Sequence, residues 1–479
     1  MNTTKSEVSY LAPSVVGPRI HSLLEAHRNA RHGVGLERAV HYTEFFKKYA
    51  KKYNSQPMKM AQALKYHLEK RTIAIHENEL IVGSHTEHRI GAICHIELAG
   101  FVMLEDLFRF SKRKTNPLYV DPKMRWQVIF KVLPFWLNRY LVMKAFPFRE
   151  QIQYMLSQLK ASQFIINEAG GIAHFLPHYE ALVSLGTNGL RLKIQQSMQK
   201  NHTPAELENL EAQLVALDAI ELFADRYRQL AIEQDRHDIE TAINVKKPAT
   251  TLHQALQTIW FFQLLIQVES LDQGISLGRL DQYLLHLYTQ DVTEHGRIHA
   301  ADLLSAFLIK TAEIIPLFSD RLTQYFGGLP TGQALTLGGA DQNQICAANE
   351  LTELLLELIP ILPVRQPNWH ARLSSQSKQS YRKKVAETLA KGTASPALYN
   401  DDIIIPALKK AGFPKEYLWN YATVGCVEPA LPGISFTSSD AALVNIAYPV
   451  WQIFHNKTPL YRLSRKPSQP VSVSKIQSI

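Results

Sequence analysis

The sequence predicts an α/β fold in which long amphipathic helices alternate with isolated short strands. Two observations lead to this prediction. Helical spacing of apolar residues dominates most of the 479 residues, and the few short runs that are typical of strands lie far apart along the chain. Because such strands have no partner nearby in sequence, we expect the sheet to form by non-local pairing.

Three short runs are typical of strands. They are LIVGS at residues 80–84, HARLS at residues 370–374 and YATVG at residues 421–425. Each is too short for a stable helix and contains β-branched or other apolar residues. We therefore expect a strand at each of these three positions.

The clearest helix start is the segment Thr203-Pro204-Ala205-Glu206. It combines a capping threonine, a proline in the first turn and a glutamate three residues after the cap. Apolar residues then recur near helical spacing, at Leu207, Leu210, Leu214, Leu217 and Phe223. This pattern predicts a helix to about Gln234, and a second pattern predicts a helix from Ser380 to a stop at Gly392.

Composition and charge indicate an ordinary globular protein. Hydrophobic residues make up 46% of the chain, charged residues make up 20%, and the formal net charge is +9. Lysine and arginine are scattered, apart from short clusters at residues 112–114 and 382–384. Such clusters favour a solvated face over a nucleic-acid site, so we expect no nucleic-acid partner.

The chain shows no targeting or membrane signal. The N-terminal residues MNTTKSEVSYLAPSVVG lack a basic start followed by an apolar run, and the strongly apolar stretch at residues 258–268 is too short to span a bilayer. Cys94, Cys346 and Cys426 are too few and too far apart for a disulfide framework, and no CxxC pair suggests zinc. We therefore predict a cytoplasmic protein with no membrane partner.

The segment YATVGCVEPALPG, residues 421–433, places Cys426 two residues before Glu428. Because Pro429 follows, the glutamate favours extended geometry, in which residues two apart face the same side about 6.6 Å apart. We therefore expect both side chains to point at one substrate. A nearby carboxylate raises the pKa of a thiol, which suits a neutral thiol that exchanges a hydrogen atom beside a carboxylate that moves a proton. A buried structural cysteine remains the alternative on spacing alone.

The run GISLG at residues 274–278 matches the G-x-S-x-G pattern of a serine hydrolase. That pattern needs a buried strand directly before it, whereas here polar residues and a helical segment precede it. No G-x-G-x-x-G, Walker or H-E-x-x-H pattern occurs either, so LTLGGA at residues 335–340 indicates a turn and not a phosphate site. Hydrolase, nucleotide-binding and zinc-protease functions are therefore disfavoured.

GCVEP at residues 425–429 resembles the active-site cysteine loop of the glycyl radical enzymes, the pyruvate formate-lyase-like family. Other family-like segments follow in consistent order. They are ENELIVGSHTEHRIGA (77–92), HFLPHYEALVSLGTNGL (174–190), the helix and G-R-x-D-Q-Y turn (251–284), LTLGGADQNQICAANELT (335–352) and PALYNDDIIIPAL (396–408). The resemblance covers roughly residues 15–450, and the chain is identified as a member on these motifs.

The resemblance implies a function for the cysteine loop. In this family a glycyl radical oxidises the loop cysteine to a thiyl radical, which abstracts a hydrogen atom from a substrate carbon. Cys426 matches that cysteine, and Glu428 matches a glutamate that acts as general base on a substrate hydroxyl. The implied reaction is cleavage of a C–O, C–C or C–N bond in a small molecule. The dehydratase or lyase type is favoured, closest in motif to diol and glycerol dehydratases, because formate-lyases carry two adjacent cysteines at this point.

Further site residues follow from the same resemblance. His174 and Asp440 match residues that bind substrate hydroxyls in diol dehydratases of the family, and we expect Ser276 to face the same pocket. The alternative for each is a polar group whose hydrogen bonds are satisfied within the core. Cys94 and Cys346 are predicted to be structural.

The family fold is a ten-stranded α/β barrel, built from two five-stranded halves and surrounded by many helices. No R-V-x-G-[YFW] pattern, which bears the radical in this family, occurs in the 479 residues, and similarity fades near residues 448–451. We therefore expect about the first half of the barrel. The expected pyruvate formate-lyase-like domain covers residues 1–460 and is truncated on its C-terminal side, with a polar, disordered tail over residues 461–479.

The resemblance also implies partners. An S-adenosylmethionine radical enzyme is expected as activator, no cofactor is expected to be bound in this chain, and the glycyl radical is expected from a C-terminal segment that it lacks. The chain is then inactive unless a second chain supplies the glycine loop. Three accounts stay open: one fragment of a split enzyme, an inactive truncated remnant, or a non-catalytic interaction protein. Which substrate is used and which bond is cleaved cannot be told from the sequence.

Overall fold

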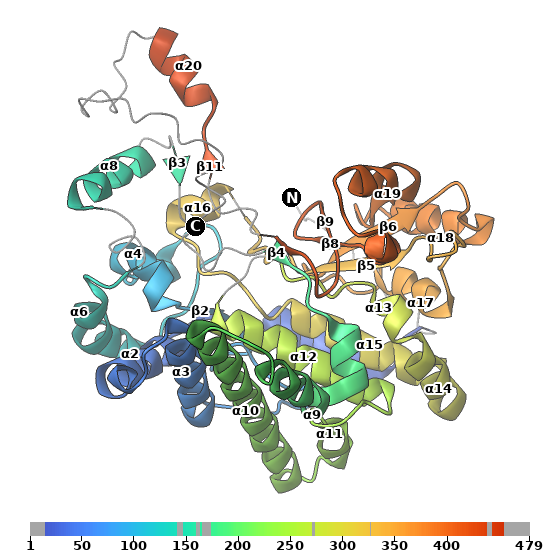
Figure 1. The fold of residues 1–479 in the computed structure, drawn as a ribbon, viewed down its shortest axis with the longest axis horizontal. Helices are drawn as coiled ribbons and strands as arrows, with labels where there is room; N and C mark the ends of the chain where they lie inside the picture. The colour runs from blue at the N-terminus through green and yellow to red at the C-terminus, as the bar shows by residue number, and fades with distance from the viewer. Residues whose placement is uncertain are drawn as a thin grey trace, which may run out of the picture. The chain divides into compact units, whose positions relative to one another are not determined.

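The computed structural model describes residues 15–140, 147–159, 163–164, 174–270, 274–325, 327–437 and 443–454. The chain divides into two compact units, one formed by residues 1–140 and 168–439 and the other by residues 141–167 and 440–479. The larger unit contains the cysteine loop and most of the described elements (Figure 1). The predicted tail at residues 461–479 lies outside the described residues.

Helices make up most of the larger unit. Its α-helices are α1 (Pro18–Asn29), α2 (Glu37–Lys48), α3 (Gln56–Lys70), α4 (Ile96–Asp106), α5 (Pro122–Gln127), α6 (Leu133–Trp136), α9 (Tyr179–Met198), α10 (Pro204–Glu233), α11 (His237–Ala242), α12 (Leu252–Glu269), α13 (Leu280–Tyr283), α14 (Leu285–His295), α15 (Arg297–Thr311), α16 (Asp320–Tyr325), α17 (Glu350–Leu358), α18 (Gln379–Ala390) and α19 (Asp401–Lys410). Short helical turns are η1 (Ala50–Lys52), η2 (Phe110–Lys112), η3 (Val128–Val132) and η4 (Lys415–Asn420). In the smaller unit, β3 (Gln163–Phe164) pairs antiparallel with β11 (Leu443–Val444), and the helices are α8 (Phe148–Leu159) and α20 (Ala447–Phe454).

Both helices predicted from the sequence are confirmed. α10 begins with the expected capping box, in which the Thr203 N–H donates to Glu206 Oε2 at 2.7 Å and the Glu206 N–H donates back to Thr203 Oγ1 at 3.4 Å. α18 ends two residues before Gly392, whose positive φ of 77° reverses the chain direction. Local capping chemistry is therefore enough to place both elements.

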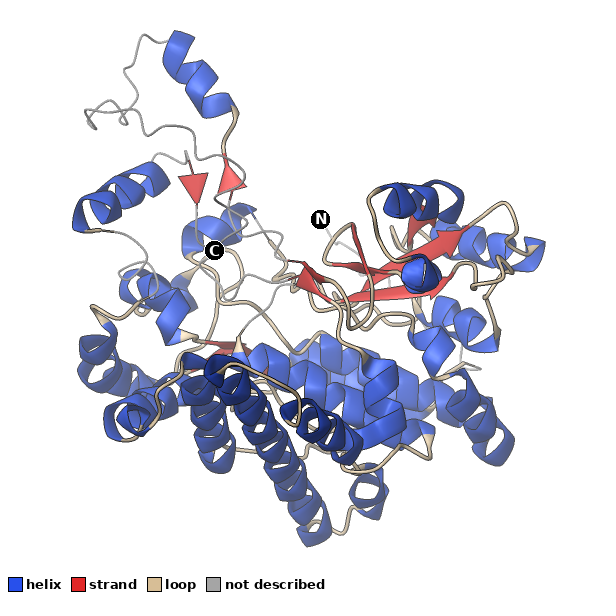
Figure 2. Ribbon diagram, viewed as in Figure 1, coloured by secondary structure: helices blue, strands red, loops and turns tan. Residues whose placement is uncertain are grey.

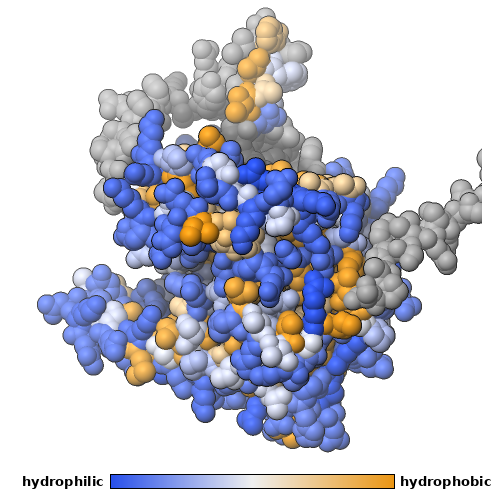
Figure 3. Space-filling model, turned by 90° about the vertical axis from the view of Figure 1, so that its right-hand side faces the viewer, coloured by the Kyte–Doolittle hydropathy of each residue, from blue (hydrophilic) through white to orange (hydrophobic). Residues whose placement is uncertain are grey.

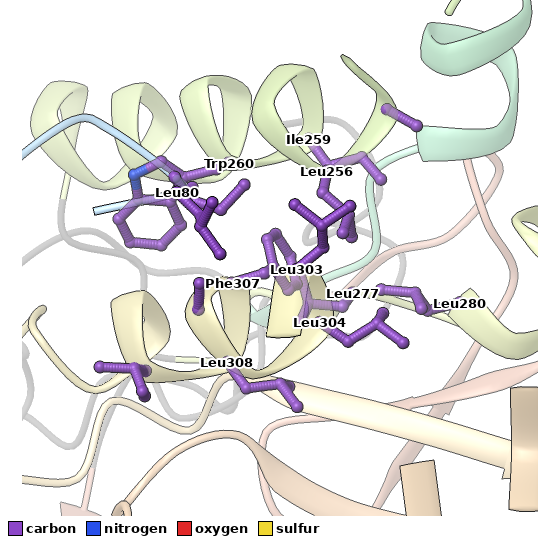
Figure 4. Close-up of a cluster of buried hydrophobic side chains, with 14 of the residues drawn as sticks. Leu80, Leu256, Ile259, Trp260, Leu277, Leu280, Leu303, Leu304, Phe307 and Leu308 are labelled. Carbon is purple, nitrogen blue, oxygen red and sulfur yellow. The ribbon is translucent and has the colours of Figure 1, made fainter. Parts of the chain in front are cut away.

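The core of the larger unit lies around α12 and α15, which run side by side (Figure 1). Figure 4 shows Leu256, Ile259 and Trp260 of α12 packed towards Leu303 and Phe307 of α15, all of them fully buried. Helices that are apolar on all sides, as these two nearly are, must be covered on every face. Strands β5 to β9 lie on one side of these two helices (Figures 1 and 2).

Strand pairing in the larger unit is mostly parallel. The strands are β1 (His32–Gly35), β2 (Ile90–Ile93), β4 (His174–Phe175), β5 (Ala334–Gly338), β6 (Asn368–Leu373), β7 (Ala397–Asn400), β8 (Ala422–Val424), β9 (Glu428–Ala430) and β10 (Phe436–Thr437). β1 pairs with β2, and β5–β6–β7 form a second parallel sheet, with α17 and α18 as its crossover helices. Bridges at Ile275 and Ser276 link β4 to β5. The non-local pairing expected from the sequence is confirmed.

Two of the three predicted strands are confirmed, as β6 and β8. The strand predicted at residues 80–84 is wrong, because this segment pairs with a side chain instead of another strand. The amide of Gln257 donates to the carbonyl of Val82 and accepts from its N–H, at 2.9 Å in both cases. The Trp260 Nε1–H donates to the carbonyl of Gly83 at 3.0 Å. Side chains of α12 therefore satisfy backbone groups that a neighbouring strand would otherwise satisfy.

The surface formed on the side of α14, α17, α18 and α19 is mostly hydrophilic, with hydrophobic residues in small groups between the polar ones (Figure 3). Among the described residues, no helix combines the length and the apolar character that a membrane span requires. Within the same described ranges, no group of three histidine, cysteine, aspartate or glutamate side chains is placed to bind a metal ion.

We expect Phe307→Ala to lower the free energy of unfolding by about 3–5 kcal/mol, because the ring is fully buried between α12 and α15 and its removal leaves a cavity. Urea titration followed by circular dichroism measures the change. The matched control is Ile298→Ala on the same helix, where the side chain is 51% exposed and the loss should stay below about 1 kcal/mol. Equal losses for the two variants would contradict this account of the core.

Candidate active site

The cysteine loop is a tight β-hairpin. β8 and β9 pair antiparallel, with Val424 opposite Glu428, so that only Gly425, Cys426 and Val427 make the turn. Gly425 has a positive φ of 57°, which a residue with a side chain rarely adopts. The expectation that Cys426 lies in an extended segment is therefore wrong: Cys426 is in the turn, and its residue is exposed.

Gly425 also permits a close approach. A Cβ on this residue would lie 2.6 Å from His174 Cε1 and 3.0 Å from Glu428 Oε2. Two other glycines with positive φ meet here, since a Cβ on Gly274 would lie 3.0 Å from the Cα of Gly425, and one on Gly332 would lie 3.2 Å from the Cα of Gly274. The sequence analysis did not identify this convergence. Bare backbone at these positions leaves room for the ring of His174 beside the turn.

His174 and Glu428 form a direct pair. Nδ1 of His174, which begins β4, lies 2.6 Å from Oε1 of Glu428, and Oε2 of Glu428 accepts the N–H of Val427 at 3.1 Å. Burial acts to raise the pKa of the Glu428 carboxyl, but the N–H of Val427 and His174 outweigh it and hold the pKa below its usual value. Because a carboxylate only accepts hydrogen bonds, Nδ1 must carry the hydrogen. Glu428 is thus an ionised carboxylate whose orientation is set by the ring of His174.

Alternate residues of β6 face the hairpin. Asn368 Nδ2 donates to the carbonyl of Gly425 at 3.3 Å, and four positions further along the strand, Arg372 Nη1 donates to the carbonyl of Tyr421 at 2.8 Å. His370 lies between these two residues on the strand. The period of two along a strand therefore places all three side chains under the loop.

Arg372 is fully buried and paired on both sides of its guanidinium. Nε and Nη2 donate to the two carboxylate oxygens of Asp401, each at 2.9 Å, and Nη1 also donates to the carbonyl of Trp419 at 3.0 Å. The guanidinium lies 3.8 Å from the centre of the Tyr421 ring, and the Tyr421 hydroxyl donates to Asp401 Oδ1 at 2.6 Å. This network fixes the start of β8.

The G-R-x-D-Q-Y segment supports the same region. Arg279 donates to the carbonyl of Trp419 at 2.9 Å and to the carbonyl of Gly338 at 2.8 Å. Asp281 Oδ2 accepts the N–H of Gly338 at 2.8 Å and the hydroxyl of Thr352 at 2.6 Å. The charged residues of this motif therefore join the end of β5 to the segment before β8.

His370 is buried without a hydrogen-bond partner. Its residue is 2% exposed, and neither ring nitrogen has a partner within the described part of the chain. Burial lowers the pKa of His370 to about 4, although the Glu428 carboxylate acts in the opposite direction. The ring lies edge-on to that of Tyr399, with centroids 5.2 Å apart. His370 is therefore a neutral imidazole at physiological pH.

Of the five predicted site residues, the structure pairs His174 with Glu428 and places Cys426 in the turn two residues before that glutamate. Ser276 is fully buried, and its hydroxyl donates to the carbonyl of Ala334 at 3.3 Å and accepts the N–H of Gly278 at 3.1 Å. Its predicted place in a substrate pocket stays a prediction. Asp440 lies outside the described residues, and its role also stays a prediction.

The sequence analysis missed two side chains that lie next to the hairpin, His370 and Tyr399. The Tyr399 hydroxyl donates to the carbonyl of Cys426 at 3.2 Å. For His370 a signal was available, because His370 and Arg372 place polar side chains two positions apart on the strand predicted at residues 370–374.

We expect Arg372→Met to lower the free energy of unfolding by about 3–5 kcal/mol, because it leaves the Asp401 carboxylate buried and unpaired. The double variant with Asp401→Asn should recover part of this loss. Chemical denaturation measures both. The control is Lys383→Met, whose side chain is 74% exposed and whose loss should stay within about 0.5 kcal/mol. A loss as small for Arg372→Met would show that the buried pair is not needed.

Stability should fall as pH falls from 6.5 towards 4. In the unfolded chain His370 binds a proton near pH 6.5, whereas burial lowers its pKa to about 4 in the folded chain. Between these two pH values the unfolded chain binds more protons, so the free energy of unfolding falls by about 3 kcal/mol for His370 alone. His27 and His85, with pKa values also lowered to about 4 by burial, add to the effect. Urea midpoints recorded across this range give the slope.

The variant His370→Phe should make that slope shallower, since phenylalanine fills the same space without binding a proton. His237→Phe is the control, because the His237 side chain is 78% exposed and should leave the slope unchanged. An unchanged slope in His370→Phe would mean that His370 titrates alike in the folded and unfolded chain.

Comparisons with known proteins show similarity over most of the chain. The family model described as pyruvate formate lyase-like matches residues 13–457. The isethionate sulfite-lyase of Nitratidesulfovibrio vulgaris is 27% identical over 469 residues, which cover 91% of this chain and 56% of the relative. The chain thus spans little more than half the length of that relative.

Solved structures are similar over the same extent. A glycyl radical enzyme from Archaeoglobus fulgidus is 31% identical with a TM-score of 0.84, over 96% of this chain and 62% of that one. The glycerol-bound B12-independent glycerol dehydratase from Clostridium butyricum is 25% identical with a TM-score of 0.86, over 93% of this chain and 59% of that one. The resemblance drawn from the motifs is confirmed, and the chain belongs to the pyruvate formate lyase-like family of glycyl radical enzymes.

Proposed function

We propose that this chain provides the cysteine, the base and part of the substrate site of a glycyl radical lyase or dehydratase. One observation carries the proposal. Cys426 is exposed in the turn of a hairpin, and the strand that follows the turn begins with Glu428, which is paired with His174. The similar proteins named above include a sulfite-lyase and a glycerol dehydratase, which supports the lyase or dehydratase type among the reactions that cleave a C–O, C–C or C–N bond.

The chemistry needs a one-electron oxidant, which a glycyl radical supplies when it is present. In this chain Cys426 would pass the hydrogen atom of its thiol to that glycyl radical, and its sulfur radical would then take a hydrogen atom from a substrate carbon. Glu428, an ionised carboxylate, accepts the proton of the hydroxyl on that same carbon, which eases departure of a leaving group from the neighbouring carbon. The product radical then takes a hydrogen atom back from the thiol of Cys426. His174 keeps the carboxylate oriented through its Nδ1–H.

Other predicted residues have places in this proposal. From the family resemblance, Asp440 is proposed to bind a substrate hydroxyl. Ser276 contacts the substrate only if its hydroxyl gives up its bond to the carbonyl of Ala334, so we propose it as the least direct of these contacts. The proposed domain spans residues 1–460.

We infer that the parallel strands of the larger unit belong to one half of a ten-stranded barrel. In support, β7 pairs only with β6 in the described part of the chain, and Leu398 on β7 is 54% exposed. The remaining strands and the radical glycine would then lie on residues outside these 479, which fits the fraction of each relative that the chain spans. A dry, closed site of this kind protects a radical from side reactions.

The proposal implies two partners in the cytoplasm. One is an S-adenosylmethionine radical enzyme that generates the glycyl radical. The other is the segment that carries the glycine, which can be continuous with this chain or a separate polypeptide. An exposed strand edge such as that of β7 would otherwise be a site of non-specific association.

The test is reconstitution. The chain should be combined anaerobically with the C-terminal part of a relative and its activating enzyme, and followed by electron paramagnetic resonance and by product formation from diols and hydroxysulfonates. We expect Cys426→Ala to keep the glycyl radical signal and lose turnover, and Glu428→Gln to lower turnover by about 10²–10⁴-fold. Cys346→Ala, at a buried position, is the control and should remain active. Turnover by Cys426→Ala would refute the proposal.

A further inference from the structure

The peptide group between Cys426 and Val427 is held at both ends. Its carbonyl accepts the hydroxyl of Tyr399 at 3.2 Å, and its N–H donates to Oε2 of Glu428 at 3.1 Å. A peptide group is planar, so these two bonds fix its orientation as one rigid plane. The same plane connects the backbone of the thiol-bearing residue to the carboxylate of the base.

We propose that Tyr399 is a positioning residue for this site. By its bond to the Cys426–Val427 peptide, its hydroxyl fixes the thiol of Cys426 and the carboxylate of Glu428 relative to each other. The meaning of this geometry for catalysis rests on the proposed function, whereas the geometry can be tested without any radical chemistry. The family-like segment at residues 396–408 contains Tyr399, but the sequence analysis gave this residue no role.

The Tyr399 ring is itself well supported. On β7 it is the register partner of Arg372, and β7 ends directly before Asp401, which pairs with that arginine. On its other side the ring meets the edge of His370 at an angle of 72°. The phenol therefore projects from β7, which is paired with β6, towards the turn of the hairpin.

Tyr399 also stays a hydrogen-bond donor over a wide pH range. Burial raises the pKa of the phenol to about 12, and the nearby Glu428 and Cys426 act in the same direction. The hydroxyl can thus orient the peptide throughout the range in which Glu428 is ionised.

Loss of the hydroxyl has a defined consequence. In Tyr399→Phe the carbonyl of Cys426 loses a protein donor, and the peptide can rotate about its flanking bonds. Rotation breaks the bond from the Val427 N–H to Glu428, and the carboxylate then loses part of what holds it beside the turn. The distance between carboxylate and thiol is no longer fixed, while β5, β6 and β7 keep their pairing.

Alkylation of Cys426 in the 479-residue chain tests this directly. Cys94 and Cys346 are buried, at 0% and 8% exposure, so iodoacetamide reacts first with Cys426. Glu428→Gln removes a negative charge near the thiol and should speed alkylation at fixed pH by up to about tenfold, which corresponds to about one unit of thiol pKa. In the Tyr399→Phe background we expect the same substitution to change the rate by less than about twofold.

Tyr417→Phe is the matched control, because this tyrosine lies on η4 before the hairpin and is 44% exposed. In the Tyr417→Phe background, Glu428→Gln should raise the alkylation rate of Cys426 as much as it does in the unmodified chain. If the increase is equally large in Tyr399→Phe, the hydroxyl does not position the peptide and the proposal is wrong. Equal urea midpoints for the two phenylalanine variants exclude general unfolding as the cause.

Hydrogen exchange in the unmodified chain gives a second test that needs no variant. Although Val427 is 66% exposed, its N–H should exchange at least about tenfold more slowly than in an unstructured peptide, because it is bonded to Glu428. Exchange at the unstructured rate would overturn the proposal. Alkylation and hydrogen exchange are both independent of turnover. A failed reconstitution would therefore leave the positioning role of Tyr399 untouched, and a failure of these two measurements would leave the proposed function untouched.

Discussion

The guanidinium of Arg372 is the interaction on which the rest of the site depends. It joins three segments, because it starts on β6, binds both carboxylate oxygens of Asp401 at the start of α19 and donates to the carbonyls of Trp419 and Tyr421 before β8. A buried charge is strongly unfavourable unless it is paired. The folded chain must therefore bring these segments together, and in doing so it lays the cysteine hairpin across the face of β6.

A second constraint is the absence of side chains where the hairpin meets its neighbours. Gly425, Gly274 and Gly332 approach one another so closely that a Cβ on any of them would collide with His174, Glu428 or another backbone. The space they leave allows an imidazole to reach the carboxylate at 2.6 Å. The buried arginine thus fixes the base of the hairpin, and the glycines allow its functional groups to meet.

Several features could be predicted because they depend on residues close in sequence. The cap of α10 is one, and the family motif around Cys426 and Glu428 is another. The strand predicted at residues 80–84 failed because its backbone partner is the amide of Gln257, 175 residues from Val82. The extended geometry predicted for Cys426 failed because the positive φ of Gly425 and the pairing of β8 with β9 make a turn there.

The sequence by itself determined the α/β class, the helices α10 and α18 and the family. Periodicity, capping and short motifs are local, so they can be recognised without knowing what packs against them. Only the tertiary structure decided that His174 would meet Glu428, 254 residues away, and that Tyr399 would hold the carbonyl of Cys426. Those contacts depend on strand register and on the close approach of separate segments, which are set by the packing of the whole unit.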